Sequence, residues 1–434
     1  GEPDIVHTYP AGYGREFEIH GMFAESQNTI EVNDGGRIIT KNVSVGTLSY
    51  NGVTIQKRYD VAINNLPEEK YQNNPELYFI INTSLTPQIA VSENGYVRYL
   101  QSDYKASKLV IENKKMALYP TYSGKNTDLL GRVALNYTTG THHDTIKVNN
   151  NYIYLSFSTW GSEDRLVEIN SSGAKLRELS FGKLIQNSLD LQTYPQDDAV
   201  FKQIAFGEDV NNIYIVSGQK KYIDWFHANS LVYDSSTDIL YVSSRTRGVL
   251  AIDYSQWKLI WWMADETLAT EFPLYIPFNV HFKDLASLDD YRVKGAGMDD
   301  GPKNQHALFF LANGNLGMFD NQGDEDTNPN GSRYVEYKIT GTHGNYTATK
   351  VYEYRDTSLY SRIMSDVDFT GENYQNLLLT YAYPTARILE VEKSSKNVLF
   401  RLDLPFMTYR ADKMPLYYDE GRVYSEDCNL KNPN

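Results

Sequence analysis

The chain of 434 residues contains a single cysteine, Cys428, so it can form neither an internal disulfide nor a cysteine-rich metal site. It also contains no run of about 18 apolar residues, which argues against a transmembrane helix, and no signal peptide is visible. Positive charge is scarce, since the net charge is −14. Nucleic acids and anionic membrane surfaces bind basic faces, so both are excluded as general partners. An anionic ligand would need cationic groups gathered locally.

Tyrosine is abundant, with 35 residues, and Asn, Asp, Gly, Ser and Thr recur throughout. Alternation of apolar and polar residues predicts strands in NYIYLSFS, GVLAIDYSQWKLIWWM and KNVLFRLDL. The short polar runs SSTD, ANGN, SENG and SSKN predict hairpin turns. Helical periodicity is confined to the two short stretches 197–206 and 284–291. These patterns predict an all-β protein.

The strand–turn–strand pattern repeats, and three of the repeats begin about 80 residues apart. Self-similarity in an all-β chain predicts a β-propeller, in which the innermost strand of each blade lines a central channel. The N-terminal residues do not share this repeated strand–turn–strand pattern. We expect a small N-terminal β-sandwich over residues 1–75 and a propeller over residues 76–434.

Four of the eight histidines stand where predicted repeats begin, namely His142, His143, His227 and His306. If the repeats are blades, these side chains converge at one end of the channel. A single histidine beside an inner strand is more often structural, but several at equivalent positions predict a site.

Two kinds of site remain open on the residues alone. Three histidines can bind zinc or copper, or they can bind an oxyanion with one of them acting as nucleophile or general acid. Arg245 follows the strand after His227, and Arg333 follows His306. Because a guanidinium fits a tetrahedral oxyanion and is repelled by a metal ion, the arginines favour an anion such as sulfate.

The motifs GTHHD, DWFHANS, YVSSR, NQHALFF and SRYVEY, in this order and spacing, resemble those of the bacterial arylsulfate sulfotransferases. The segments GMFAESQNTIEV and QIAVSENGYVRYL are similar to the N-terminal domain and the first blade of that family. The resemblance implies a six-bladed propeller. It also implies transfer of a sulfuryl group from an aryl sulfate ester to a phenol, without a nucleotide sulfate donor, by a ping-pong mechanism through a sulfohistidine.

Carried over residue by residue, the resemblance makes His306 the nucleophile and gives His227 and Arg245 sulfate-binding and charge-stabilising roles. The remaining family histidine falls in GTHHD, where His143 is preferred to His142. Arg333 matches a recurrent family position and is expected to bind substrate. The chain reads QHA at the nucleophile where family members often read QHD, which changes the expected hydrogen bonding of His306.

Aromatic side chains are expected to frame the phenyl ring of a substrate, the candidates being Trp225, Phe226, Tyr381 and Tyr383. No metal or organic cofactor is expected. The resemblance implies export to the periplasm or cell exterior, and the family includes homodimers. The alternative function is a non-catalytic propeller that binds an anionic glycan or another ligand.

Overall fold

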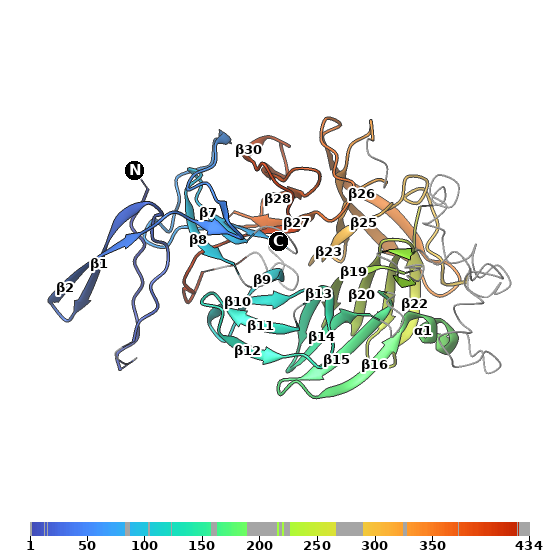
Figure 1. Cartoon of the computed structure of the whole chain (residues 1–434). Helices are drawn as coiled ribbons and strands as arrows, with labels where there is room; N and C mark the ends of the chain where they lie inside the picture. Colours follow the sequence, from blue (N-terminus) through green and yellow to red (C-terminus); the bar gives the residue numbers. More distant parts are fainter. Residues whose placement is uncertain are drawn as a thin grey trace. The chain divides into compact units, whose positions relative to one another are not determined.

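The computed structural model describes residues 2–12, 14, 16–82, 87–102, 105–122, 124–157, 163–188, 215–216, 219–220, 226–265, 290–323, 328–371, 373–422 and 424. These residues form antiparallel sheets and one helix (Figure 1). Six of the sheets have four or five strands and are the blades of a six-bladed β-propeller, as predicted. Among the described residues, no helix has the length and apolar character needed to cross a membrane.

The blades follow the chain. The first contains β31 (Arg410–Met414), β6 (Leu77–Ile81), β7 (Gln88–Val91) and β8 (Val97–Gln101), and the second β9 (Ala106–Glu112), β10 (Lys115–Pro120), β11 (Lys125–Asp128) and β12 (Val133–Asn136). The third contains β13 (Thr141–Val148), β14 (Asn151–Ser156), β15 (Arg165–Asn170) and β16 (Lys175–Ser180), and the fourth β19 (Ala228–Asp234), β20 (Ile239–Ser244), β21 (Gly248–Asp253) and β22 (Lys258–Met263). The fifth contains β23 (His306–Phe310), β24 (Leu316–Asp320), β25 (Arg333–Thr340) and β26 (Thr347–Arg355), and the sixth β27 (Asp366–Thr370), β28 (Asn376–Tyr381), β29 (Arg387–Glu392), β30 (Val398–Asp403) and β5 (Val61–Asn64). Three two-stranded sheets pair β1 (Ser26–Asp34) with β2 (Arg37–Val45), β3 (Ser49–Tyr50) with β4 (Val53–Thr54), and β17 (Ile215–Val216) with β18 (Gln219–Lys220).

All four predicted hairpin turns are confirmed. SSTD joins β19 to β20, ANGN joins β23 to β24, SENG joins β7 to β8, and SSKN joins β29 to β30. The turns are short and polar, so closing each hairpin costs little conformational entropy.

In the fifth and sixth blades the outermost strand is the least buried. In the fifth blade β24 is buried throughout, whereas only two of the nine residues of β26 are buried. Inner strands are covered on both faces by neighbouring side chains, which explains why β28 (NLLLTY) reads as a continuous apolar run rather than an alternating one. In this blade the outer strand is the one that keeps much of its surface in water.

One compact unit comprises residues 1–118, 127–132 and 368–426. Its core contains Tyr78, Ile80, Leu378, Ile388 and Phe400, among others. In this unit the late strand β31 pairs with the early strand β6, which ties the two ends of the propeller sequence into one sheet.

The β-sandwich expected for residues 1–75 stays a prediction. Four of the five described strands in this range form two hairpins, β1–β2 and β3–β4. β5 precedes the expected boundary at residue 75, yet it pairs with β30 as the fifth strand of a blade. The propeller sheets therefore begin earlier in the chain than the sequence indicated.

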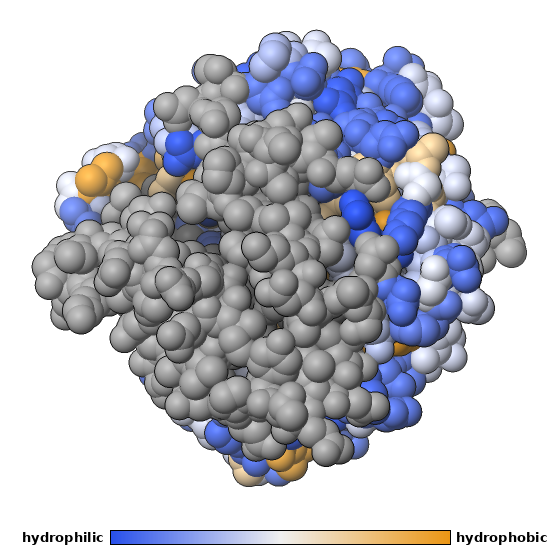
Figure 2. Space-filling view, turned by 90° about the vertical axis from the view of Figure 1, so that its right-hand side faces the viewer, coloured by the Kyte–Doolittle hydropathy of each residue, from blue (hydrophilic) through white to orange (hydrophobic). Residues whose placement is uncertain are grey.

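The other compact unit comprises residues 119–126, 133–367 and 427–434. Its described cores are centred on residues such as Leu155, Leu250 and Trp262 in one cluster and Met263, Met318 and Val335 in another. The helix α1 (Phe181–Ser188) was not predicted; the Ser180 hydroxyl accepts a hydrogen bond from the Lys183 amide at 3.1 Å and caps its first turn. The stretch 197–206 lies outside the described residues. Figure 2 shows a mainly hydrophilic described surface with small apolar patches.

Within this unit, hydrogen bonds connect the first strands of three successive blades. The Asp144 carboxylate of β13 accepts the Leu231 amide of β19 at 2.8 Å, and the Ser230 hydroxyl of β19 accepts the Leu308 amide of β23 at 2.9 Å. These bonds hold β13, β19 and β23 side by side at the ends from which the histidines project.

Candidate active site

The four histidines predicted at repeat starts line one cavity of about 170 Å³. The other lining residues are Tyr122, Glu163, Asn229, Arg245, Asn304, Ile363 and Met364. All of them belong to the unit that contains the third, fourth and fifth blades. The predicted convergence of His142, His143, His227, His306 and Arg245 is therefore what the structure shows.

His142 and His143 both reach the cavity because β13 is bulged at this point. In a regular strand two adjacent side chains point to opposite faces. The pairing of β13 with β14 shifts register between His142 and Thr145, and His143 adopts a left-handed φ of 51°. A bulge re-aims side chains in this way. The sequence left open which of the two histidines faces the site, and the answer is both.

His227 and Arg245 are joined through the backbone. His227 precedes β19 with a φ of 47°, and its carbonyl accepts the Arg245 amide at 2.9 Å. The Arg245 Nε donates to Asn304 Oδ1 at 2.7 Å, and the Asn304 amide group donates to two backbone carbonyls. The guanidinium is thus oriented by a residue that is itself fixed.

His306 begins β23 and is held by the residue before it. The Gln305 side chain donates to Ser243 Oγ at 3.0 Å and to the Ser244 carbonyl at 2.8 Å, and the Gln305 carbonyl accepts from Asn229 at 2.8 Å. Ala307 occupies the bulge that follows, with a φ of 49°. At the corresponding bulge of β13 an aspartate, Asp144, bonds to the next blade, and alanine cannot make that bond.

Three imidazoles form a connected row. The Nε2 atoms of His143 and His227 are 3.0 Å apart, and His306 Nε2 is 3.4 Å from His143 Nδ1. Neighbouring cationic imidazoles would repel each other, and a bound anion would relieve that repulsion. The added charge of Arg245 makes the cavity suited to a small oxyanion.

Glu163 is a site residue that the sequence reasoning missed. Its Oε1 lies 2.8 Å from His142 Nε2 and its Oε2 lies 2.8 Å from His227 Nδ1. Burial alone would raise the pKa of Glu163, but the charges of His227 and His142 and their hydrogen bonds lower it well below its usual range. Glu163 is therefore a carboxylate that compensates the imidazoles.

The same cluster meets the geometric requirements of a metal site. Ligand atoms of His142, His143 and Glu163 lie within 4.8 Å of one another. Imidazole and carboxylate together suit zinc. The oxyanion and metal interpretations of the histidines therefore both keep a geometric basis, with Arg245 in the cavity lining as the observation that favours the oxyanion.

Left-handed backbone conformations gather around the cavity. Besides His143, His227 and Ala307, positive φ angles occur at Asn304 (57°) and Met364 (59°). Such conformations are uncommon for residues other than glycine and cost of order 1–3 kcal/mol each when strained. Their clustering is typical of a functional site that the surrounding fold holds in place.

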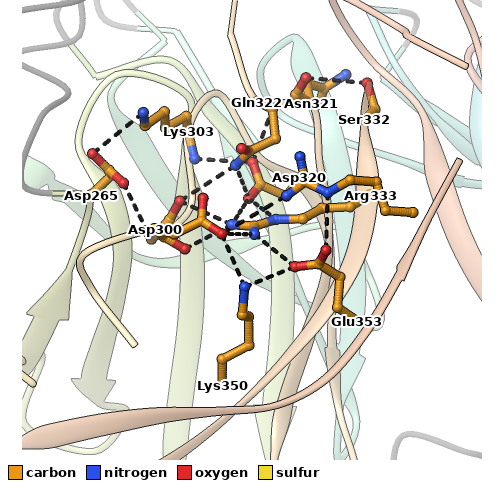
Figure 3. A network of polar contacts seen from close by, with 12 residues as sticks. Asp265, Asp300, Lys303, Asp320, Asn321, Gln322, Ser332, Arg333, Lys350 and Glu353 are labelled. Carbon is orange, nitrogen blue, oxygen red and sulfur yellow. Dashed lines mark hydrogen bonds and ion pairs between the residues drawn. The ribbon is translucent and has the colours of Figure 1, made fainter. Parts of the chain in front are cut away.

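Arg333 does not line the cavity, contrary to the prediction. Its side chain has 0% exposure and pairs with Asp320 at 2.9 Å and Glu353 at 2.9 Å, together with Asp300 and Lys350 around it (Figure 3). Burial alone would lower the pKa of Arg333, but these carboxylates raise it, so the guanidinium stays charged. Its five donors are used by the fold, not offered to a ligand.

The predicted aromatic frame differs from the cavity lining. Phe226 is buried and stacks on Phe181 with ring centroids 3.9 Å apart, so it belongs to the core. Trp225 lies outside the described residues. Tyr381 is a buried residue of β28 and Tyr383 is half-buried; neither lines this cavity, and their substrate role stays a prediction.

Tyr122, Ile363 and Met364 supply the apolar lining instead. The Tyr122 hydroxyl hydrogen-bonds to His142 Nε2 at 3.1 Å. No sequence signal marked these three residues, because each comes from a loop that only the tertiary structure brings to the histidines.

Comparison with known proteins gives two curated relatives. The chain is 27% identical over 202 residues to the arylsulfate sulfotransferase AssT of Escherichia coli O6:H1, which covers 42% of the chain and 33% of that protein. It is 25% identical over 280 residues to AssT of Lelliottia amnigena, which covers 56% of the chain and 44% of that protein. The chain thus aligns with less than half of the length of these relatives.

Similar solved structures include the β-propeller domain of Myceliophteria thermophila Cps50 (Swd1), with a TM-score of 0.40 and 9% identity over 82% of the chain and 97% of that domain. Citrobacter koseri AztD has a TM-score of 0.36 and 8% identity over 89% of the chain and 96% of that protein. A sequence profile described as Arylsulfotransferase (ASST) matches residues 64–417, which is most of the chain. The protein belongs to the arylsulfotransferase family.

Proposed function

We propose that this protein transfers a sulfuryl group from an aryl sulfate ester to a phenolic acceptor, without a nucleotide donor, through a sulfohistidine at His306. The observation that carries the proposal is the meeting of four histidines and Arg245 around one small cavity. Family membership supports the reaction class.

In the first half-reaction a lone pair of the neutral His306 imidazole attacks sulfur. The N–S bond forms while the S–O bond to the phenol breaks, and the electron pair leaves on the phenolate oxygen. A neutral imidazole is available near pH 7 because histidine titrates near 6.5. The covalent intermediate divides one difficult displacement into two easier ones.

In the second half-reaction the acceptor phenol attacks the same sulfur. Its O–H proton passes to the histidines and replaces the one that a protonated histidine gave to the first phenolate, the new S–O bond forms, and the electron pair of the N–S bond returns to His306. Arg245 and His227 bind the sulfate oxygens throughout, which resembles the electrostatic stabilisation needed for phosphoryl transfer. The apolar lining from Ile363 and Met364 suits an aryl ring.

The test is release of nitrophenol from p-nitrophenyl sulfate, which we expect only when a phenol acceptor is present. Donor alone should add one SO₃ group to His306, detectable by mass spectrometry of the peptide. His306→Ala should abolish both signals while the fold is retained. Normal turnover by that variant would rule out His306 as the nucleophile.

Two other functions are separated by simple controls. Activity that survives extensive chelation excludes a metal-dependent hydrolase at His142, His143 and Glu163. Stoichiometric binding of an aryl sulfate without turnover would favour the non-catalytic propeller that binds an anionic ligand. Export and homodimer formation also remain proposals, to be tested by cell fractionation and by light scattering.

A further inference from the structure

Asn304 lines the cavity and uses both ends of its side-chain amide. The amide oxygen accepts the Nε–H of Arg245 at 2.7 Å. The NH₂ group donates to the backbone carbonyls of Gly323 and Arg362, both at 2.6 Å. An amide offers an oxygen acceptor and two N–H donors, and here each faces a complementary group. The reversed amide would set its oxygen against two carbonyls and its NH₂ against Arg245, so the surroundings fix its orientation.

The backbone at this position suits asparagine. Asn304 has a left-handed φ of 57° and stands two residues before His306, at which β23 begins. Asparagine is several-fold enriched in this conformation, because its short polar side chain tolerates it. The residue is buried, so water competes little for its hydrogen bonds. The fold therefore holds the amide in place at the entry to the fifth blade.

The bonds of Asn304 connect three blades within one compact unit. Arg245 follows β20 of the fourth blade, Asn304 precedes β23 of the fifth, and Arg362 precedes β27 of the sixth. The next residues after Arg362 are Ile363 and Met364, which line the cavity. We call residues 362–364 the lining segment. One amide therefore fixes both the cation that would bind a sulfate and the segment that would contact its aryl ring.

We propose that Asn304 is a positioning residue that sets the orientation of the Arg245 guanidinium relative to the lining segment. The inference rests on the proposed function, since it takes Arg245 as the group that binds the sulfate. Because the guanidinium is planar, a bond at Nε fixes the direction in which its other N–H groups point. An aryl sulfate joins a charged head group directly to a flat ring, so both contacts must be correctly placed at the same time.

The experiment measures binding instead of turnover, with two sulfonates whose C–S bond replaces the ester linkage. Methanesulfonate reports on the anionic head group, and benzenesulfonate adds the ring. Wild type should bind benzenesulfonate more tightly. For Asn304→Ala we expect calorimetric titration to show an affinity for methanesulfonate that is lower by roughly 10–100-fold, the effect of losing a hydrogen bond to a charged group. The preference for benzenesulfonate should also shrink, because the lining segment loses the bond to the Arg362 carbonyl.

A double-mutant cycle with Arg245→Lys identifies the path of this effect. Lysine keeps the positive charge but has a methylene group where arginine has Nε, so it loses the donor that Asn304 accepts. In the Arg245→Lys protein, Asn304→Ala should therefore change the affinity for methanesulfonate by less than about threefold. An equal loss in both backgrounds would overturn the proposal, because Asn304 would then act on the fold and not through Arg245.

Asn321→Ala is the matched control. Asn321 is a buried asparagine that follows β24 of the same blade, and its amide donates to the Ser361 carbonyl at 2.6 Å, directly before the lining segment. It is not among the residues that line the cavity. Loss of its bond should lower the melting temperature while the affinity for methanesulfonate stays within about threefold of wild type. If both alanine variants lose head-group affinity equally, the role of Asn304 in orienting Arg245 is refuted.

The outcomes also separate this inference from the proposed function. A wild-type protein that shows the sulfonate preference and the coupling between Asn304 and Arg245, but transfers no sulfuryl group from any aryl sulfate, would refute the proposed function alone. A wild-type protein that transfers sulfuryl groups, with an Asn304→Ala variant that binds both sulfonates as tightly as wild type, would refute the role of Asn304 alone.

Discussion

Replacement of Arg333 by methionine tests whether this arginine stabilises the fold or binds substrate. Arg333 and Asp320 both have side chains with 0% exposure and are 2.9 Å apart. Burial raises the pKa of Asp320 even though Arg333 lowers it. Without Arg333, Asp320 keeps hydrogen bonds from the Lys303 amide and from Gln322 but loses its guanidinium. Removing one partner of a buried ion pair typically costs about 3–5 kcal/mol.

We therefore expect Arg333→Met to lower the free energy of unfolding by about 4 kcal/mol. For a domain of about 150–250 residues this corresponds to a melting temperature lower by roughly 8–16 °C, measured by calorimetry. The double variant with Asp320→Asn should recover about 1–3 kcal/mol, because the uncompensated charge is then gone. Well below the transition, kcat/KM should be close to wild type. An unchanged melting temperature with a loss of activity above about 10²-fold would show instead that Arg333 binds substrate.

Three further outcomes follow from other parts of the structure. Arg245→Lys keeps the charge but loses the fork that Asn304 orients, so kcat/KM for aryl sulfates should fall about 10²-fold at unchanged melting temperature, and full activity would contradict the assigned role. Gly248 has a φ of 81°, and a Cβ there would lie 2.0 Å from the Met263 carbonyl oxygen, so Gly248→Ala should lower the free energy of unfolding by about 3 kcal/mol or more. Gly314 has a φ of 82° in open space, so Gly314→Ala should lower it by only about 1 kcal/mol in the same denaturation assay. Equal losses in the two variants would refute the steric reasoning. Burial alone would raise the pKa of Glu353, but hydrogen bonds from Lys350 and Arg355 and the charge of Arg333 lower it from 4.5 to about 2. A lowered folded-state pKa stabilises the protein above pH 4.5 and that stability is lost as pH falls toward 2, so Glu353→Gln should flatten the fall in unfolding free energy across this window, and parallel curves would show that Glu353 contributes nothing.

The local chemistry of the chain predicted the strands and the turns. Alternating runs such as KNVLFRLDL and polar turns such as SSTD act over a few residues, so neighbouring side chains are enough to determine them. The same locality explains why the starts of the repeats, and with them His143, His227 and His306, could be recognised as equivalent positions.

Tertiary structure decided what no local pattern encodes. Arg245 and Arg333 each follow a strand after a histidine, but the carboxylates of Asp300 and Glu353, which come from other segments, enclose only Arg333. The bulge at His143 turns two adjacent histidines toward one cavity, and Glu163 gains its position only because two blades meet there. The ion-pair partners and the orientation of a side chain depend on segments distant in sequence. The residue types of the site could therefore be predicted, while the network that orients them could not.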